Sequence, residues 1–173
     1  MSKIVAVSGI DELRDYLRQL DMLLKESITP VKVHGAMRAI HFKENGDIFV
    51  HAKDNMIVAA GFDFICDSMC LGASRPAVMG YIAVGTNTAT PALGNSALGA
   101  EIARQAATYA HTAGTQSFTL TTTFAPGAAT GAITEAAVAN AASGGQLLDR
   151  VTFGVINKGA NDSLQQQFVF SLT

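Results

Sequence analysis

The second half of the sequence has very few charged residues. Residues 1–80 contain nine Lys or Arg and ten Asp or Glu, whereas residues 81–173 contain three and four. Soluble domains usually carry about a quarter of their residues as charged side chains. We therefore expect the surface of residues 81–173 to be neutral and polar or to be covered by other subunits. The alternative is a soluble β domain whose hydrated surface is formed by Thr and Ser side chains.

Runs of basic residues and long apolar runs are also missing. The formal net charge is −2 and the Lys and Arg residues are scattered, which argues against electrostatic binding of nucleic acid. The first apolar run covers only residues 4–7, far fewer than a secretory signal or a membrane-spanning helix needs. We expect a protein that is made in the cytoplasm and that binds neither nucleic acid nor membrane.

Cysteine is scarce. Cys66 and Cys70 are the only two, and their spacing places both on one face of a helical segment. No second pair of metal ligands lies near them in the sequence, so a zinc site is not indicated. The pattern predicts two buried free thiols.

Motifs for catalysis and cofactor binding are absent. The glycine-rich stretch from Gly80 to Arg104, GYIAVGTNTATPALGNSALGAEIAR, contains no Lys for outer phosphates and lacks the GxGxxG spacing of a dinucleotide fold. No serine lies in a GxSxG turn. In the hairpin register expected below, His41 and His51 lie on opposite sheet faces. We expect no catalytic, cofactor-binding or metal-binding residues, and hence no enzyme.

A helix is predicted near the start of the chain. Ser8 is a suitable N-cap, Asp11 and Glu12 fall in the first turn, and Pro30 disfavours helix in the residue before it. Apolar residues recur at spacings of three and four and form one seam: Ile10, Leu13, Leu17, Leu20 and Leu24. This seam is a candidate interface: it packs either on the protein's own body or against another chain. The sequence predicts a helical arm over residues 1–29 and a second domain over residues 30–173.

The second domain has the pattern of strands. Asn45-Gly46 suits a tight hairpin turn, which would place Phe42 opposite Phe49. Residues 56–71 are predicted to form a buried helix. SFTLTTTF and LQQQFVFSL alternate apolar and polar residues, and Ser143-Gly144-Gly145 marks a turn between two further strands. The fold class predicted is mainly β: an antiparallel β-sandwich, jelly-roll or Ig-like, with an N-terminal amphipathic helix and one further short helix.

The order of segments resembles a known family. The glycine-rich stretch is followed by a Thr-rich strand and then by ITEAAVANAASGGQLLDRVTFGVINKGANDSLQQQFVFSL. This order is similar to a domain in structural proteins of tailed bacteriophages, and the likeness covers residues 33–173. The resemblance implies a β-sandwich that is repeated on the particle as a tail-fibre, head-fibre or decoration protein.

Composition and resemblance lead to one expectation of function. We expect a non-enzymatic structural component of a tailed phage virion. The favoured role is a capsid decoration or cement protein, and the alternative role is a collar or tail-fibre protein. Its partners would be itself, as a dimer or trimer, and other virion proteins such as the major capsid protein or tail proteins. A host-glycan-binding receptor module and a cytosolic accessory domain are the alternatives. Aromatic residues of the second half fall mainly at core-facing positions, which favours a scaffold over glycan binding.

Overall fold

The computed structural model describes residues 10–27 and 31–173. The chain divides into two units, Met1–Val31 and Lys32–Thr173. The first unit contains helix α1 (Ile10–Ser27), which carries Asp11 and Glu12 in its first turn, where the helix dipole favours negative charge. The predicted N-cap Ser8 and the predicted boundary at Thr29-Pro30 lie outside the described residues.

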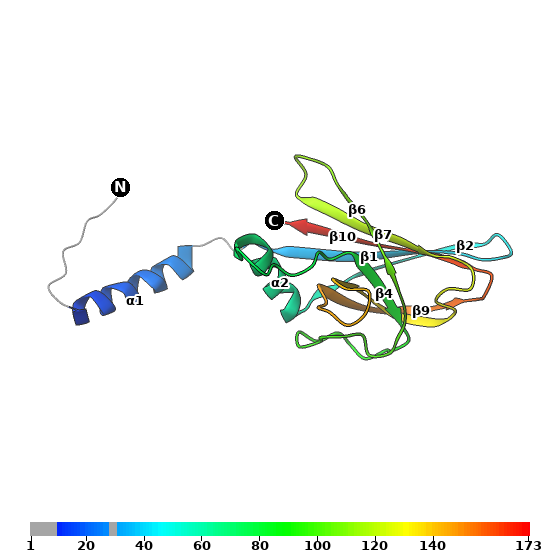
Figure 1. Cartoon of the computed structure of the whole chain (residues 1–173), viewed down its shortest axis with the longest axis horizontal. Helices are drawn as coiled ribbons and strands as arrows, with labels where there is room; N and C mark the ends of the chain where they lie inside the picture. The colour runs from blue at the N-terminus through cyan, green and yellow to red at the C-terminus, as the bar shows by residue number, and fades with distance from the viewer. Residues whose placement is uncertain (1–9, 28–30) are drawn as a thin grey trace. The chain divides into compact units, whose positions relative to one another are not determined.

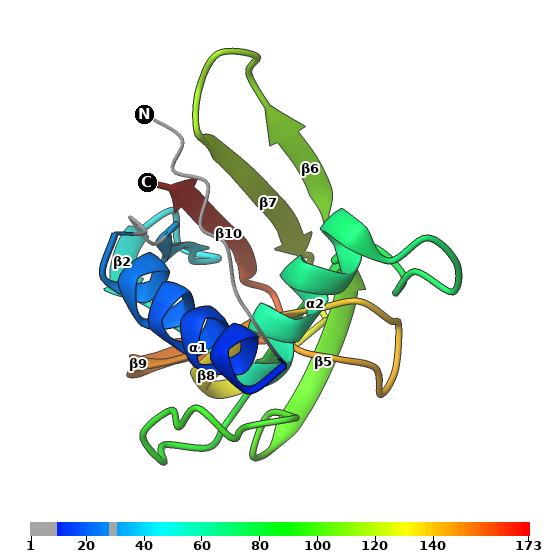
Figure 2. The ribbon, with the colours of Figure 1, turned by 90° about the vertical axis from the view of Figure 1, so that its left-hand side faces the viewer.

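The second unit is a sandwich of two five-stranded sheets, and all of its strand pairs are antiparallel. The strands of the first sheet are, in spatial order, β2 (Ile48–Asp54), β1 (Val33–Phe42), β10 (Ser163–Leu172), β7 (Ser117–Phe124) and β6 (Thr108–His111). Those of the second are β3 (Met56–Ile57), β9 (Asp149–Lys158), β8 (Gly131–Ala139), β4 (Tyr81–Gly85) and β5 (Glu101–Ala106). Figures 1 and 2 show the two layers. The predicted fold class is confirmed.

The main core lies between the two sheets. From the first sheet, β7 contributes Leu120 and Phe124, and β10 contributes Leu164, Phe168 and Phe170. The predicted alternation of both strands is therefore confirmed, because these apolar residues face inward together with Thr122, while Thr119, Thr121 and Thr123 lie on the other face. Rings of Phe118 and Phe170 stack with centroids 5.0 Å apart.

The outer face of the second sheet is also covered. A second apolar cluster joins Ala137 and Ala139 of β8 to Leu98 of the long loop between β4 and β5 and to Leu147 before β9. The two covered faces explain why every residue from Ile133 to Ala139 is buried, and why the sequence of β8 shows no alternation. The predicted turn between β8 and β9 is present, and Gly144 and Gly145 adopt positive φ there.

The β1–β2 hairpin forms with a register different from the predicted one. Phe42 pairs with Ile48 rather than with Phe49, which pairs with His41. The reason is the turn: the Lys43 N–H donates to the Asp47 carbonyl, and Gly46 has φ of 91° inside a loop longer than two residues. A one-residue shift in register changes which side chains share a face. His41 and His51 consequently lie on the same face, contrary to the prediction.

Helix α2 (Ala59–Cys70) lies at one end of the sandwich (Figures 1 and 2). It begins three residues later than predicted, because Met56 and Ile57 pair with β9. It is also not buried: Gly61 is its one fully buried residue. Cys66 and Cys70 are free but exposed, so the prediction of buried thiols is wrong. The helix packs through Phe64 and Ile65, which leaves the cysteine side in solvent.

Candidate functional site

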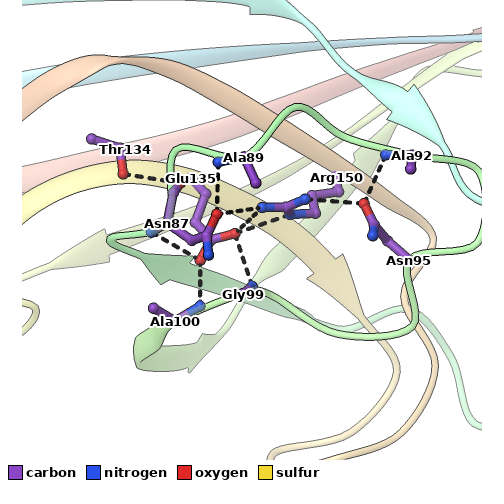
Figure 3. A network of polar contacts seen from close by, with 9 residues as sticks. All are labelled: Asn87, Ala89, Ala92, Asn95, Gly99, Ala100, Thr134, Glu135 and Arg150. Carbon is purple, nitrogen blue, oxygen red and sulfur yellow. Dashed lines mark hydrogen bonds and ion pairs between the residues drawn. The ribbon is translucent and has the colours of Figure 1, made fainter.

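The glycine-rich loop between β4 and β5 is held by one buried carboxylate (Figure 3). Glu135 of β8 is fully buried. Its Oε1 accepts the N–H of Ala100 at 2.8 Å and that of Asn87 at 3.3 Å, and its Oε2 accepts the N–H of Gly99 at 3.1 Å. Three backbone donors from both ends of the loop thus converge on one side chain. A carboxylate that accepts backbone N–H groups in this way fixes a loop in the manner of a helix cap.

Arg150 of β9 completes the cluster. Its Nε and Nη2 donate to Glu135 Oε2 at 3.0 and 2.7 Å, and its Nη1 donates to Asn95 Oδ1 at 3.0 Å. The side chains of the two partners are 3% and 0% exposed. Because both oxygens of Glu135 are occupied and the pair is shielded from water, the cluster has no free group for acid–base chemistry.

Two asparagines shape the loop around this ion pair. Asn87 Oδ1 accepts the Ala89 N–H at 2.7 Å, and Asn95 Oδ1 accepts the Ala92 N–H at 2.8 Å. Thr134 donates to the Asn87 carbonyl at 3.1 Å. These contacts are local turns of a kind that asparagine commonly makes. The loop is therefore a braced connection.

The remaining charged residues of the second half also brace loops. Arg104 pairs with Glu101 at 2.7 Å and donates to the carbonyls of Ala141 and Gly144 at 2.8 and 2.7 Å. Lys158 is buried and donates to the Ala125 carbonyl at 3.1 Å. These side chains hold the β8–β9 and β7–β8 connections to the body of the sandwich.

Asp162 joins the β9–β10 turn to the first hairpin. Its carboxylate accepts the N–H of Gly159 at 2.8 Å and of Glu44 at 3.0 Å, and contacts His41 Nε2 at 2.8 Å. The Gly159 and Glu44 amides, with smaller contributions from His41 and Lys43, hold the pKa of Asp162 well below its usual range. The ionised form is stabilised, as expected for a carboxylate that accepts several hydrogen bonds.

Asp149 at the start of β9 is a different case. It is completely buried, and it accepts the Val138 N–H at 2.8 Å and the side-chain amide of Asn55. Burial without a cationic partner raises the pKa of Asp149 to about 7. Asn55 Oδ1 is buried without a hydrogen-bond partner. Rotation of the Asn55 amide by half a turn would let this oxygen accept the proton of a neutral Asp149.

Two further findings concern the described residues. No three His, Cys, Asp or Glu side chains within them come together as a metal site. Among helices α1 and α2, neither is both long and apolar enough to cross a membrane.

The exposed face of the β1–β2 hairpin carries a group of large apolar side chains, which we call the hairpin patch: Ile40, Phe42, Ile48 and Val50. They form two adjacent cross-strand pairs on the face opposite buried Met37, Ala39 and His41. Ile48 and Val50 are 60% and 63% exposed. A cluster of this kind on a protein surface is a typical contact site for another macromolecule.

An open groove of about 550 Å³ adjoins the hairpin patch. Strand β2 forms one side, and β9 with the β4–β5 loop forms the other. Strand β3 pairs only with Asp149 and Arg150, which leaves the following residues of β9 along the groove. The lining residues are Val50, His51, Ala52, Lys53, Thr88, Thr152, Phe153 and Gly154.

The predicted interface seam lies on α1. Ile10 and Leu17 are exposed, whereas the side chains of Leu13, Leu20 and Leu24 lie outside the described residues. The seam as an interface therefore stays a prediction.

Sequence reasoning missed the buried charged groups. Glu135 is the single charged residue in the mainly apolar stretch ITEAAVA, and Asp149 and Arg150 are the two charged residues in the mainly apolar stretch LLDRVTF. Charged residues within apolar strands are a recognisable sign of a buried ion pair.

Comparison of the chain with known protein families, curated proteins and solved structures gives no match.

Proposed function

We propose that this protein is a non-enzymatic structural component of a tailed bacteriophage virion, a decoration or cement protein of the capsid. The proposal is based on where the charged side chains of residues 81–173 lie and what they contact. Six of the seven charged residues of this half either brace a connecting loop or are buried within the sandwich, and the seventh, exposed Glu101, is paired with Arg104. The outward surface is therefore almost entirely neutral, which suits permanent contact with neighbouring subunits because little charge must be desolvated.

Three further observations support the proposal. The segment order resembles phage structural proteins, the hairpin patch offers an apolar contact, and the buried carboxylates are committed to holding the fold. A collar or tail-fibre protein would use the same features, so position on the particle is the finer part of the proposal. The exposed ring of Tyr109 is the feature that favours the alternative of a glycan-binding module, since glycan sites use aromatic platforms.

The test is the protein content of particles from the phage that encodes this chain. Particles are purified by density gradient and washed in high salt, and the chain is quantified against the major capsid protein by mass spectrometry. We expect a fixed ratio that survives washing. Absence from washed particles would contradict the proposal, and glycan-dependent binding to host cells by the isolated protein would favour the alternative.

A second test concerns the α1 seam. If the seam docks onto another chain, deletion of residues 1–29 leaves the melting temperature of the sandwich nearly unchanged while incorporation into particles fails. Replacement of Leu17 and Leu20 by Asp has the same effect, because a charge cannot enter a dry contact without cost. A large loss of stability in either variant would instead show that the helix covers its own domain.

A further inference from the structure

Strand β2 is an edge strand whose backbone is available for pairing. Within residues 32–173 it pairs with β1 alone. The N–H of Lys43 donates to Asp47 and the N–H of Asn55 donates to Gly35, so odd-numbered residues of this ladder hydrogen-bond toward β1. Alternate residues of an antiparallel strand point their backbone groups to opposite sides. The N–H and C=O groups of Ile48, Val50 and Ala52 therefore point to the open edge.

The residues along β2 complement their own reversed order. The stretch from Asp47, which directly precedes β2 and accepts the Asn45 side-chain amide at 2.8 Å, to Lys53 reads DIFVHAK, with a negative residue at one end, a positive residue at the other and Val50 in the middle. When two copies lie antiparallel about Val50, Asp47 of each copy faces Lys53 of the other. Phe49 then faces His51, and Ile48 faces Ala52. A lone Lys on an edge strand usually discourages pairing, whereas in this register each Lys meets an opposite charge.

The same register also satisfies the backbone. It places Ile48 opposite Ala52 and Val50 opposite its own copy, and these are the residues whose N–H and C=O groups point outward. Each of these pairs can exchange both hydrogen bonds of an antiparallel ladder. A register shifted by one residue would match outward-pointing groups with inward-pointing ones and would lose the ladder.

Side chains on both faces gain contacts in this arrangement. The hairpin patches of the two copies meet on the outer face, where Ile48 and Val50 are exposed in the single chain. On the inner face, Phe49 and His51 of the second copy would lie beside the groove, whose lining includes Thr152 and Gly154. The contact is the same surface on both partners, which is the geometry of a two-fold symmetric dimer.

We propose that β2 pairs with β2 of a second copy of this chain. The first sheets of the two copies then form one continuous sheet about a two-fold axis at Val50. The inference deepens the self-association contained in the proposed function and names its surface. It depends on the sequence and edge geometry of β2 and not on the position of the protein in a virion.

The test is a register-specific disulfide in the full-length chain, with Cys66 and Cys70 replaced by Ser. Val50→Cys places two Cα atoms about 5.5 Å apart across the axis, within the range that a disulfide spans. Ala52→Cys is the matched control, since its two copies lie about 14 Å apart in this register. Under mild oxidation we expect covalent dimers of the Val50→Cys protein only. Equal cross-linking at both positions, or none at position 50, would overturn the proposal.

Charge exchange provides an independent measurement. Lys53→Asp places two like-charged pairs in the interface, and we expect the dimer dissociation constant in sedimentation to rise about tenfold. The double variant Asp47→Lys with Lys53→Asp restores opposite charges and should restore the dimer. Failure of this restoration contradicts the register.

Sedimentation separates the possible failures. Dimers without cross-linking at position 50 would contradict β2 pairing and would assign self-association to another surface, such as the α1 seam. A protein that stays monomeric at all concentrations would contradict self-association itself. The virion role is tested separately on particles.

Discussion

Replacement of Arg150 by Met tests the buried cluster that holds the β4–β5 loop. Methionine keeps much of the volume of the arginine stem but removes the donors that face Glu135 at 2.7 and 3.0 Å. Glu135 would then remain fully buried with backbone amides as its main partners. Removal of one member of a buried ion pair costs about 3–5 kcal/mol.

This loss is large relative to the stability of a small domain. For a body of this size, about 3–5 kcal/mol corresponds to a fall of roughly 10–20 °C in melting temperature. We expect the same loss in the free energy of unfolding from urea titration. Hydrogen exchange at the Gly99 and Ala100 amides should accelerate more than exchange in β7, because their acceptor is no longer fixed.

Two variants make the experiment specific. Glu135→Gln combined with Arg150→Met removes the unpaired charge, and we expect it to be more stable than Arg150→Met alone. Arg38→Met is the control, because Arg38 is exposed and such substitutions usually change stability by less than about 0.5 kcal/mol. If Arg150→Met lowers stability no more than Arg38→Met does, the assignment of the cluster as the main brace of the loop is refuted.

Three further predictions concern single positions. Because burial raises the pKa of Asp149 to about 7 from 3.8, the folded state holds a proton that the unfolded state releases. Stability should fall as pH rises from about 4 to 7, by up to about 1.4 kcal/mol per unit, and Asp149→Asn should remove this slope in urea titrations at several pH values. Gln166 is buried with neither side-chain polar atom hydrogen-bonded, so Gln166→Met should raise the melting temperature; a clear fall would show that the amide has a partner. A Cβ at Gly61 would collide with the backbone carbonyl of Leu148, so Gly61→Ala should destabilise the protein in thermal unfolding, whereas Gly72→Ala, with open space around it, should not.

The fold could be predicted from the sequence where one face of a strand is buried. In β7 and β10 the inner residues are apolar except Thr122 and Gln166, and the outer ones are mainly polar, so the alternation in SFTLTTTF and LQQQFVFSL indicated both strands and their orientation. Strand β8 is buried on both faces, and its sequence, apolar except for Thr134 and Glu135, does not alternate and so indicates no orientation. Local pattern is informative only where one side of an element meets solvent.

The hairpin turn at Asn45-Gly46 was predicted correctly, but its length and the resulting strand register were not. Asn45-Gly46 does turn the chain, but the bond between Lys43 and Asp47 lengthens the loop and shifts the pairing. The residues around Asn45-Gly46 are compatible with both a two-residue turn and the longer loop, so the sequence alone could not distinguish the two. The shift matters because it places Ile40, Phe42, Ile48 and Val50 together as the hairpin patch.

The contacts of the buried charged residues could not be predicted, because their partners are distant in sequence. Glu135 binds Gly99 and Ala100 across more than thirty residues, and Asp162 contacts His41 across 121. Only the folded sandwich brings these segments together. The exposure of Cys66 and Cys70 has a similar origin: α2 approaches the body at Gly61, and this contact decides which side of the helix faces solvent.

The most direct test of the central claim is an image of the virion with this chain labelled. If a tailed phage encodes this chain, as we propose, its particles would be examined by electron microscopy with a tag fused after Thr173, beside untagged particles as control. The account predicts extra density repeated over the capsid surface, at two-fold related pairs if β2 joins two copies. Tagged particles that show no extra density on the capsid, collar or tail would contradict a structural role in the virion.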